Sequence, residues 1–450
     1  MIALLVAAAL AAPSFVERPC AAPDLAGKAR CGTVRVPENR NRPGGRAIDL
    51  NVVIIPASAQ RRLPPVFDIE GGPGLAATRN AGFYLTDGGA YHQHRDVVLV
   101  DQRGTGGSHP LACPELAQPG YQPIYPPKGV ARCRAALETG ADLAQYGTQA
   151  AVEDLDAVRA ALGYRQIALT GLSYGTAVVL RFLATYPDRV QAAVMTSVAP
   201  PFAMPPRHHA AIADRALTLL FRECATDPVC KAAFNPAGDL RRAIARLSSI
   251  PGAPSGEVFL EKLRSLMYQP ATAFQLPYVI HSAAAGDLAP FIALTQPGAT
   301  GLTYYDGLYL SVTCSESMAQ FDYPTAAAAA RRTRFGDYRL RRQHAACAQW
   351  PMAKVDRAFF KPVRATVPVL IVSGGLDPVT PREWAAKVAR DLPQSRLVVI
   401  PKMGHVFDGL SNIECYDAMI TGFLDHPNPA GVDTRCVASM MPPPFRTTKS

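Results

Sequence analysis

The chain has 450 residues, of which 48% are hydrophobic and 18% charged; this composition allows a large core and excludes global disorder. Its length exceeds one ordinary domain and falls short of three. The net charge is +10, but the arginines are scattered and do not form a stripe with aromatic residues, so we expect a solvated basic surface and no nucleic-acid partner.

The first segment is a short apolar run without charge, IALLVAAALAA, at residues 2–12. Its Ala9-Leu10-Ala11 sequence is an A-x-A cleavage pattern, which predicts a secretory signal peptide over residues 1–11 and a mature start near Ala12. The Lys or Arg that ordinarily precedes such a run is missing, and a buried N-terminal helix is the alternative. No later apolar run is long enough for a transmembrane helix. We therefore expect an exported protein, periplasmic or secreted, whose mature form has no integral membrane segment.

Short β-rich runs alternate with helical stretches over the first two-fifths of the chain. Apolar residues at helical spacing predict a helix over 148–162, with Gly163 as its C-terminal stop. This alternation is typical of a parallel sheet that is covered by helices on both faces. The strands that we expect in this part lie at residues 48–56, 66–69, 97–100, 166–170 and 191–198.

The pattern changes after Pro200-Pro201. Residues 202–362 lack a clear strand period and are rich in Ala, Leu and Arg, and segments such as 207–224 and 240–249 look helical. Strand signals return at 367–373 and 396–401. We predict a mostly parallel, doubly wound α/β sheet with an inserted, mainly helical cap domain. The core then comprises residues 12–201 and 363–450, including a Pro-rich tail, and the cap comprises residues 202–362.

The ten cysteines all follow the predicted cleavage point, and their even number suits an oxidising compartment. None lies in a CxxC motif or in a Cys/His cluster with zinc spacing, so we expect no metal site. Several free buried thiols are the alternative. We expect nearest-neighbour pairing, because each such pair closes a local loop: Cys20–Cys31, Cys113–Cys133, Cys224–Cys230, Cys314–Cys347 and Cys415–Cys436.

A nucleophile motif, G-x-S-x-G, stands at Gly171-Leu172-Ser173-Tyr174-Gly175. A predicted strand precedes it and a helix-forming stretch, 174–186, follows it. The turn between them must be sharp, so small residues are needed two before and two after the serine. Ser173 is thereby lifted clear of the sheet at the N-terminus of a helix. The motif in this context predicts an α/β-hydrolase fold with Ser173 as the nucleophile.

A serine hydroxyl needs a base, and the base needs an orienting acid. In this fold the acid and then the histidine follow the serine in chain order. Asp377 follows the predicted strand VPVLIVS, and His405 follows RLVVIP. Both lie in loops at the carboxyl ends of strands, where open α/β sheets place their sites. Taken alone, Asp377 could be a turn aspartate and His405 a surface histidine, but together with Ser173 they predict a catalytic triad.

An acyl-transfer enzyme must also stabilise an oxyanion. One donor should be the backbone N–H of Tyr174, directly after the nucleophile. The second should come from a loop after an early strand, and Gly71-Gly72-Pro73-Gly74 after VFDI fits that requirement. Glycine there lets the backbone approach substrate closely. A plain tight turn is the alternative.

Five motifs in this order resemble the proline iminopeptidase and tripeptidyl aminopeptidase family of α/β-hydrolases: GGPG, DQRGTGGS at 101–108, GLSYGT, GLDPVTP and MGH. The C-x-x-W-P sequence from Cys347 and the cysteine in the C-terminal part resemble the tripeptidyl-aminopeptidase branch. The similarity covers nearly the whole chain and is weakest over 202–300. Proline iminopeptidases commonly have His where this chain has Glu70. That departure weakens any expectation of strict proline specificity. Asp101 and Arg103 are expected to tie loops together near the site.

The resemblance implies a cap over the site and a serine peptidase mechanism without a cofactor. It also implies a peptide substrate with a free N-terminus and makes Gly72 the second oxyanion donor. Cap glutamates hold the substrate amine in proline iminopeptidases, which suggests Glu316 here. Glu316 follows an apolar, strand-like stretch, 308–312, and lies two residues after Cys314. An exposed loop glutamate is the alternative for Glu316, and the cap also contains Glu257 and Glu261.

Two other functions remain open at this stage. A carboxylesterase or lipase would use the same triad. A binding or adhesion module could keep the fold, but the complete set of Ser, Asp and His argues against it. The number of residues released and the oligomeric state cannot be read from the sequence.

Overall fold

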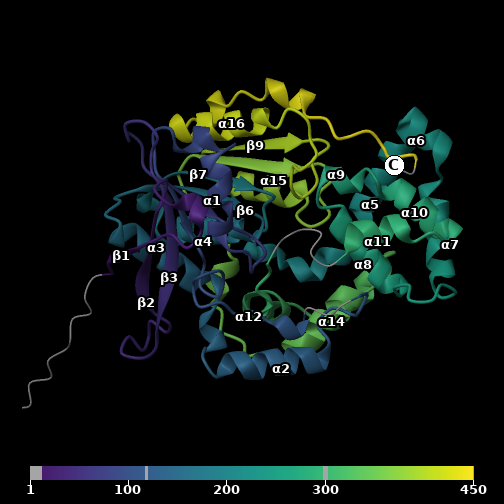
Figure 1. The fold of residues 1–450 in the computed structure, drawn as a ribbon, viewed down its shortest axis with the longest axis horizontal. Coiled ribbons are helices and arrows are strands. Elements are labelled where there is room, and N and C mark those ends of the chain that lie inside the picture. Colours follow the sequence, from purple (N-terminus) through teal and green to yellow (C-terminus); the bar gives the residue numbers. More distant parts are fainter. Residues whose placement is uncertain (1–12, 117–119, 297–302, 449–450) are drawn as a thin grey trace, which may run out of the picture.

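The computed structural model describes residues 13–116, 120–296 and 303–448, and the predicted signal peptide lies outside these ranges. One mixed sheet forms the centre of the larger part of the molecule (Figure 1). Its strand order is β1-β2-β3-β5-β4-β6-β7-β8-β9. The strands are β1 Phe15–Arg18, β2 Arg30–Pro37, β3 Ala47–Ile55, β4 Val66–Ile69, β5 Val97–Val100, β6 Ile167–Leu172, β7 Val190–Thr196, β8 Val369–Gly374 and β9 Ser395–Ile400.

The sheet changes character along its width. The pairs β1–β2, β2–β3 and β3–β5 are antiparallel, whereas every neighbouring pair from β5 to β9 is parallel. The sequence predicts β3 and all of the parallel strands, and the carboxyl ends of the parallel strands meet at one edge of the sheet. Strands β1 and β2 and the antiparallel joins were not predicted.

Alternate side chains of each parallel strand enter two different cores. In β6, Ile167 and Leu169 pack in the core under α3 and α4, while Ala168 packs in the core under α1 and α16. In β8, Ile371 belongs to the first core and Leu370 to the second. Helices therefore cover both faces of the sheet. Successive side chains of a strand point to opposite faces, and both faces of these strands are apolar, so both must be covered. The helices of this part are α1 Ala81–Leu85, α3 Thr148–Ala161, α4 Tyr174–Thr185, α15 Arg382–Asp391 and α16 Glu414–Asp425.

A helical region separates β7 from β8 in sequence and lies beside the sheet in space (Figure 1). Its first helices surround a third apolar core that includes Leu217, Phe259 and Phe291. The tail of the chain returns to this region, where Phe445 packs on Phe274 at 4.6 Å between ring centroids. The helices are α5 His209–Thr226, α6 Pro228–Ala233, α7 Pro236–Leu247, α8 Gly256–Leu266, α9 Pro270–Ala273, α10 Leu276–Ala285, α11 Ala289–Thr295, α12 Asp306–Glu316, α13 Tyr323–Ala330 and α14 Tyr338–Cys347.

One secondary-structure prediction was wrong. The apolar stretch 308–312 is not strand-like but part of α12, every residue of which from Gly307 to Glu316 is buried. A short apolar run that is buried on all sides shows no period, so it cannot be assigned to strand or helix from its pattern. Below α12 lies another helix, α2 Pro127–Glu138, which contacts both α12 and α14.

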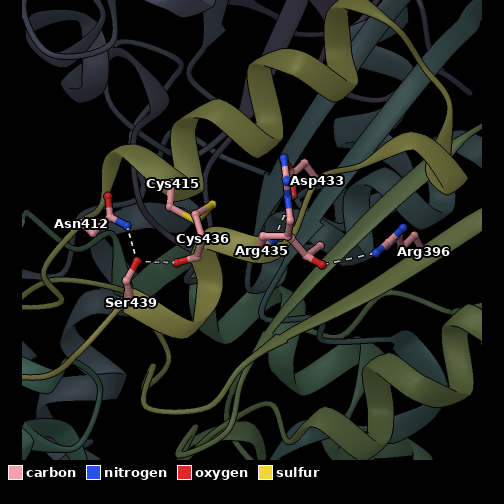
Figure 2. The surroundings of a disulfide bond; sticks show 8 residues. Arg396, Asn412, Cys415, Asp433, Arg435, Cys436 and Ser439 are labelled. Atoms are coloured by element: carbon pink, nitrogen blue, oxygen red, sulfur yellow. Dashed lines mark hydrogen bonds and ion pairs between the residues drawn. A yellow bond between two sulfur atoms is a disulfide. The ribbon is translucent and has the colours of Figure 1, made fainter.

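All ten cysteines form disulfides, and the pairs are the five predicted ones. Each bridge closes a local loop. Figure 2 shows the last of them, which joins Cys415 at the start of α16 to Cys436 in the tail. Beside it, Asn412 Nδ2 donates to Ser439 Oγ at 2.6 Å, and Ser439 Oγ donates to the Cys436 carbonyl at 2.8 Å. The bridge and these bonds attach the tail to the sheet domain.

The disulfides should contribute unequally to stability. Cys314 and Cys347 are 33 residues apart, whereas Cys224 and Cys230 are 6 apart. Loop-closure entropy then predicts a loss of about 4 kcal/mol for the Ala/Ala variant of the first pair and about 2 kcal/mol for the second. Urea unfolding of both double variants measures the difference. Equal losses would contradict the entropic explanation.

Candidate active site

The serine elbow has the geometry that its motif requires. Ser173 lies between β6 and α4 with φ 56°, a backbone conformation that a non-glycine residue rarely adopts. A Cβ on Gly171 would lie 2.8 Å from the Gly175 carbonyl oxygen, and a Cβ on Gly175 would lie 2.2 Å from the Ile69 carbonyl oxygen. Gly171 is therefore needed for close packing of β6 against α4, and Gly175 for close packing of α4 against β4; together they hold the serine in its conformation.

The three predicted triad residues meet in space. His405 Nε2 lies 2.9 Å from Ser173 Oγ, and His405 Nδ1 lies 3.0 Å from Asp377 Oδ2. Asp377 follows β8 and His405 follows β9, so adjacent parallel strands deliver both side chains to the same edge of the sheet. Asp377 is fully buried and His405 is 4% exposed. This is the arrangement in which an imidazole can take the serine proton while a carboxylate holds the opposite ring nitrogen.

Asp377 is held by the turn that follows it. Its Oδ1 accepts hydrogen bonds from the backbone N–H groups of Val379 and Thr380, at 2.7 and 2.9 Å. The Thr380 hydroxyl donates to Oδ2 at 2.6 Å and lies 3.2 Å from His405 Nδ1. Thr380 was not predicted as a site residue. Its position three residues after an aspartate, where side-chain turns form, was the available signal.

The cap region holds the histidine loop from the other side. The backbone carbonyl of Tyr268 accepts hydrogen bonds from the N–H groups of His405 and Val406, at 2.7 and 2.9 Å. The Tyr268 ring packs edge-on against the imidazole, at 5.0 Å between centroids. From the sheet side, Ser197 Oγ donates to the His405 carbonyl at 2.6 Å. The imidazole is thus fixed by contacts from both parts of the molecule.

The glycine-rich loop after β4 lies against the serine. A Cβ on Gly71 would be 3.0 Å from Ser173 Cβ. The Gly71 N–H is occupied, because it donates to the Glu70 carboxylate at 3.0 Å. The N–H of Gly72 has no hydrogen-bond partner within the described ranges. Gly72 has φ 108°, which glycine alone adopts readily. Of the two glycines, Gly72 therefore has the free donor.

Asp101 and Arg103 join segments of the sheet domain, as predicted for a structural role. Asp101 accepts from Asn51 Nδ2 at 2.9 Å and from the Thr78 backbone N–H at 3.0 Å. The buried Arg103 guanidinium binds Asp154 at 2.6 and 2.8 Å. Each residue connects loops that are distant in sequence beneath the site.

Glu316 is not an exposed loop residue. It ends α12, is 8% exposed, and bonds with both oxygens to one residue at the start of α3. Oε1 accepts from the Thr148 N–H at 2.6 Å and Oε2 from the Thr148 hydroxyl at 2.5 Å. That hydroxyl lies 2.8 Å from the phenol oxygen of Tyr174, the residue after the nucleophile. The predicted amine-anchor role of Glu316 stays a prediction, and a substrate amine would have to share oxygens that Thr148 already engages.

Glu316 should make stability depend on pH. Burial, partly offset by the Thr148 bonds, raises its pKa to about 7. Between about pH 4.5 and 7 the unfolded glutamate is ionised while the folded one keeps its proton, so stability falls as pH rises. We expect Glu316→Gln to gain about 2 to 3 kcal/mol relative to wild type across this range. Urea unfolding at pH 4.5 and 7.5 measures the change, and a constant difference would contradict it.

Family comparisons agree with this geometry. Residues 64–228, which contain the elbow and the glycine-rich loop, match the family model described as alpha/beta hydrolase fold. The chain has the α/β-hydrolase fold. Residues 331–436, which contain Asp377 and His405, match the model described as TAP-like protein. The protein is a serine hydrolase and resembles the tripeptidyl aminopeptidases.

Curated relatives extend over different shares of the chain. The tripeptidyl aminopeptidase of Streptomyces lividans is 24% identical over 98% of this chain and 90% of that protein. Serine protease Hip1 of Mycobacterium tuberculosis is 31% identical, but over 40% of this chain and 38% of that protein. Carboxylesterase B of Mycobacterium tuberculosis is 27% identical over 88% of this chain and 84% of that protein. The α/β-hydrolase thus has relatives with both peptidase and esterase names.

Proposed function

We propose that this α/β-hydrolase is an exported serine peptidase of the aminopeptidase type, which releases N-terminal residues or short peptides from peptides with a free N-terminus. The observation that carries the proposal is the hydrogen-bonded series Ser173–His405–Asp377, at 2.9 and 3.0 Å. The similarity to a tripeptidyl aminopeptidase over 98% of the chain supports the substrate class.

The mechanism follows from the roles of these groups. His405 Nε2 accepts the Ser173 proton as Oγ attacks the scissile carbonyl carbon, and Asp377 holds Nδ1–H. The N–H groups of Gly72 and Tyr174 receive the oxyanion. His405 then protonates the leaving amine, which gives an acyl-enzyme. Water, deprotonated by His405, hydrolyses the acyl-enzyme and restores Ser173. No step needs a metal or a cofactor.

Export is proposed from two features. The predicted signal peptide, residues 1–11, precedes a chain in which five disulfides form. Disulfides persist in oxidising compartments, which makes the periplasm or the medium the expected location. Across the described ranges, no helix is both long enough and apolar enough to cross a membrane.

A second candidate function is a carboxylesterase with the same triad, and the similarity to carboxylesterase B favours it. The two differ in whether the site needs a substrate ammonium. The deciding assay compares kcat/KM of the mature enzyme on tripeptidyl and aminoacyl 4-nitroanilides with free amines, on their N-acetyl forms, and on 4-nitrophenyl acetate. A peptidase of the proposed type prefers the free-amine amides over their N-acetyl forms. Turnover of the ester alone would favour the esterase.

A further inference from the structure

An aminopeptidase must pair the substrate ammonium with a carboxylate, because a charge removed from water needs a partner. Most acidic side chains of the cap and the glycine-rich loop are already engaged. Thr148 occupies both oxygens of Glu316. Two arginines, Arg264 and Arg339, hold Glu261. Glu70 accepts from the Gly71 N–H and from Asn80.

Asp306 is different. It is the first residue of α12 and is partly buried, and no hydrogen bond or ion pair joins it to another residue of the described chain. The residue before it, Tyr305, donates its N–H to the Gly74 carbonyl at 2.9 Å. This bond fixes the start of α12 against the same glycine-rich loop that touches Ser173. The backbone next to Asp306 thus contacts the loop that reaches Ser173, and the Asp306 carboxylate has no hydrogen-bond or ion-pair partner within the described ranges.

Three tyrosine rings pack together beside the first turn of α12, which Asp306 begins. Tyr309 is one helical turn after Asp306, and its ring lies between those of Tyr125 and Tyr304, at 6.0 Å from each. Tyr304 is 36% exposed, yet a Cβ on Gly72 would lie 3.3 Å from its phenol oxygen. Tyr304 therefore reaches solvent beside the oxyanion loop. A carboxylate with tyrosine rings nearby is the chemistry that binds an ammonium, by ion pairing and by cation–π attraction.

We infer that Asp306, together with Tyr125, Tyr304 and Tyr309, is the site that receives the protonated α-amine of the substrate. This inference rests on the proposed aminopeptidase function and names its specificity-determining residue. It replaces Glu316 as the candidate anchor, because Asp306 has both carboxylate oxygens available.

The electrostatics of the site agree with this role. Burial, partly offset by Arg339, raises the pKa of Asp306 to about 7. Arg339 itself is committed to Glu261, at 2.6 Å. Burial also raises the pKa of Tyr125, and the charges of Tyr309 and Asp306 add to the effect. Binding of an ammonium would stabilise the ionised form of Asp306, which burial alone disfavours.

The test compares Asp306→Asn with a matched control, Asp188→Asn, which makes the same change at an exposed position before β7, away from the carboxyl ends of the strands. Substrates are a tripeptidyl 4-nitroanilide with a free amine, its N-acetyl form, an N-acetyl form that contains lysine, and 4-nitrophenyl acetate. Asp306→Asn should lower kcat/KM on the free-amine substrate about 10- to 100-fold, mainly through KM, the scale of a lost charge-assisted hydrogen bond. Ester hydrolysis and the control should not change.

Two variants of Tyr125 separate the contribution of its ring from that of its hydroxyl, and one variant of Glu316 tests the alternative anchor. Tyr125→Leu should lower kcat/KM on the free-amine substrate about 3- to 10-fold, whereas Tyr125→Phe, which keeps the ring face, should not. Glu316→Gln should leave the ratio of free-amine to ester activity as it is in wild type.

Each other result has a distinct meaning. Equal losses on the amide and the ester in Asp306→Asn would show a structural role and overturn the inference. A loss confined to the N-acetyl lysyl substrate would show that the site reads a side-chain ammonium and not the α-amine. No loss on any substrate would place the anchor elsewhere. If wild type cleaves N-acetyl and free-amine amides equally well, the proposed function itself fails, whatever the variants do.

Discussion

Replacing Ser173 with alanine should lower kcat by about three orders of magnitude or more while the protein stays folded. The side chain carries the attacking oxygen, and its loss leaves substrate binding and oxyanion stabilisation alone. The elbow itself depends on Gly171 and Gly175, whose backbones contact the surrounding strand and helix. Alanine keeps that packing, and the melting temperature should therefore stay within a few degrees of wild type.

The matched control is Ser248→Ala, which removes an exposed hydroxyl at the end of α7. A fluorophosphonate should label wild type and this control at one serine, and peptide mapping should place the label on Ser173. The Ser173→Ala variant should take up no label. Turnover at the wild-type rate in that variant would refute the triad proposal.

The triad could be predicted from the sequence because each member stands in a local context with its own signal. Ser173 lies between a strand and a helix, and Asp377 and His405 each follow a strand. Strand order then brings the carboxyl ends of β6, β8 and β9 to one edge of the sheet without further information. The cysteines paired as predicted for a similar reason, since each bridge joins segments that are close in sequence.

Contacts between distant segments left no such signal. Glu316 and Thr148 are 168 residues apart, and their bond depends on how α12 packs against the start of α3. The aromatic surroundings of Asp306 depend in the same way on Tyr125, which comes from the segment before α2. Glu316 and Asp306 both fall in the cap predicted from the sequence, but the sequence does not show which of the two carboxylates lacks hydrogen-bond partners.

Strand β2 was missed for another reason. Its burial alternates imperfectly, with Cys31 and Gly32 both buried, and a strand of this kind does not show a clean period of two. It pairs with β1 and β3, which places three antiparallel strands at one edge of an otherwise parallel sheet. The prediction of a mostly parallel sheet was thus right for the strands that carry the site.

Asp377→Asn should lower kcat by about three to four orders of magnitude with little change in fold. An amide in this place can still accept the N–H groups of Val379 and Thr380 on its oxygen. Its NH₂ then faces His405 Nδ1, where the carboxylate accepted a hydrogen bond from Nδ1–H. The imidazole is left with the tautomer whose Nε2 carries hydrogen, and that nitrogen can no longer take the proton of Ser173.

Thr380→Val gives the matched comparison, because it changes the support of Asp377 and leaves the carboxylate in place. The Thr380 hydroxyl donates to Asp377 Oδ2 at 2.6 Å, so its loss should cost about 10-fold in kcat, the scale of one hydrogen bond to a charged group. The rate of fluorophosphonate labelling at Ser173 should fall less in Thr380→Val than in Asp377→Asn. The order is the same as for kcat, because both changes affect Ser173 through His405. Labelling of Asp377→Asn at the wild-type rate would show that Asp377 does not set the state of His405.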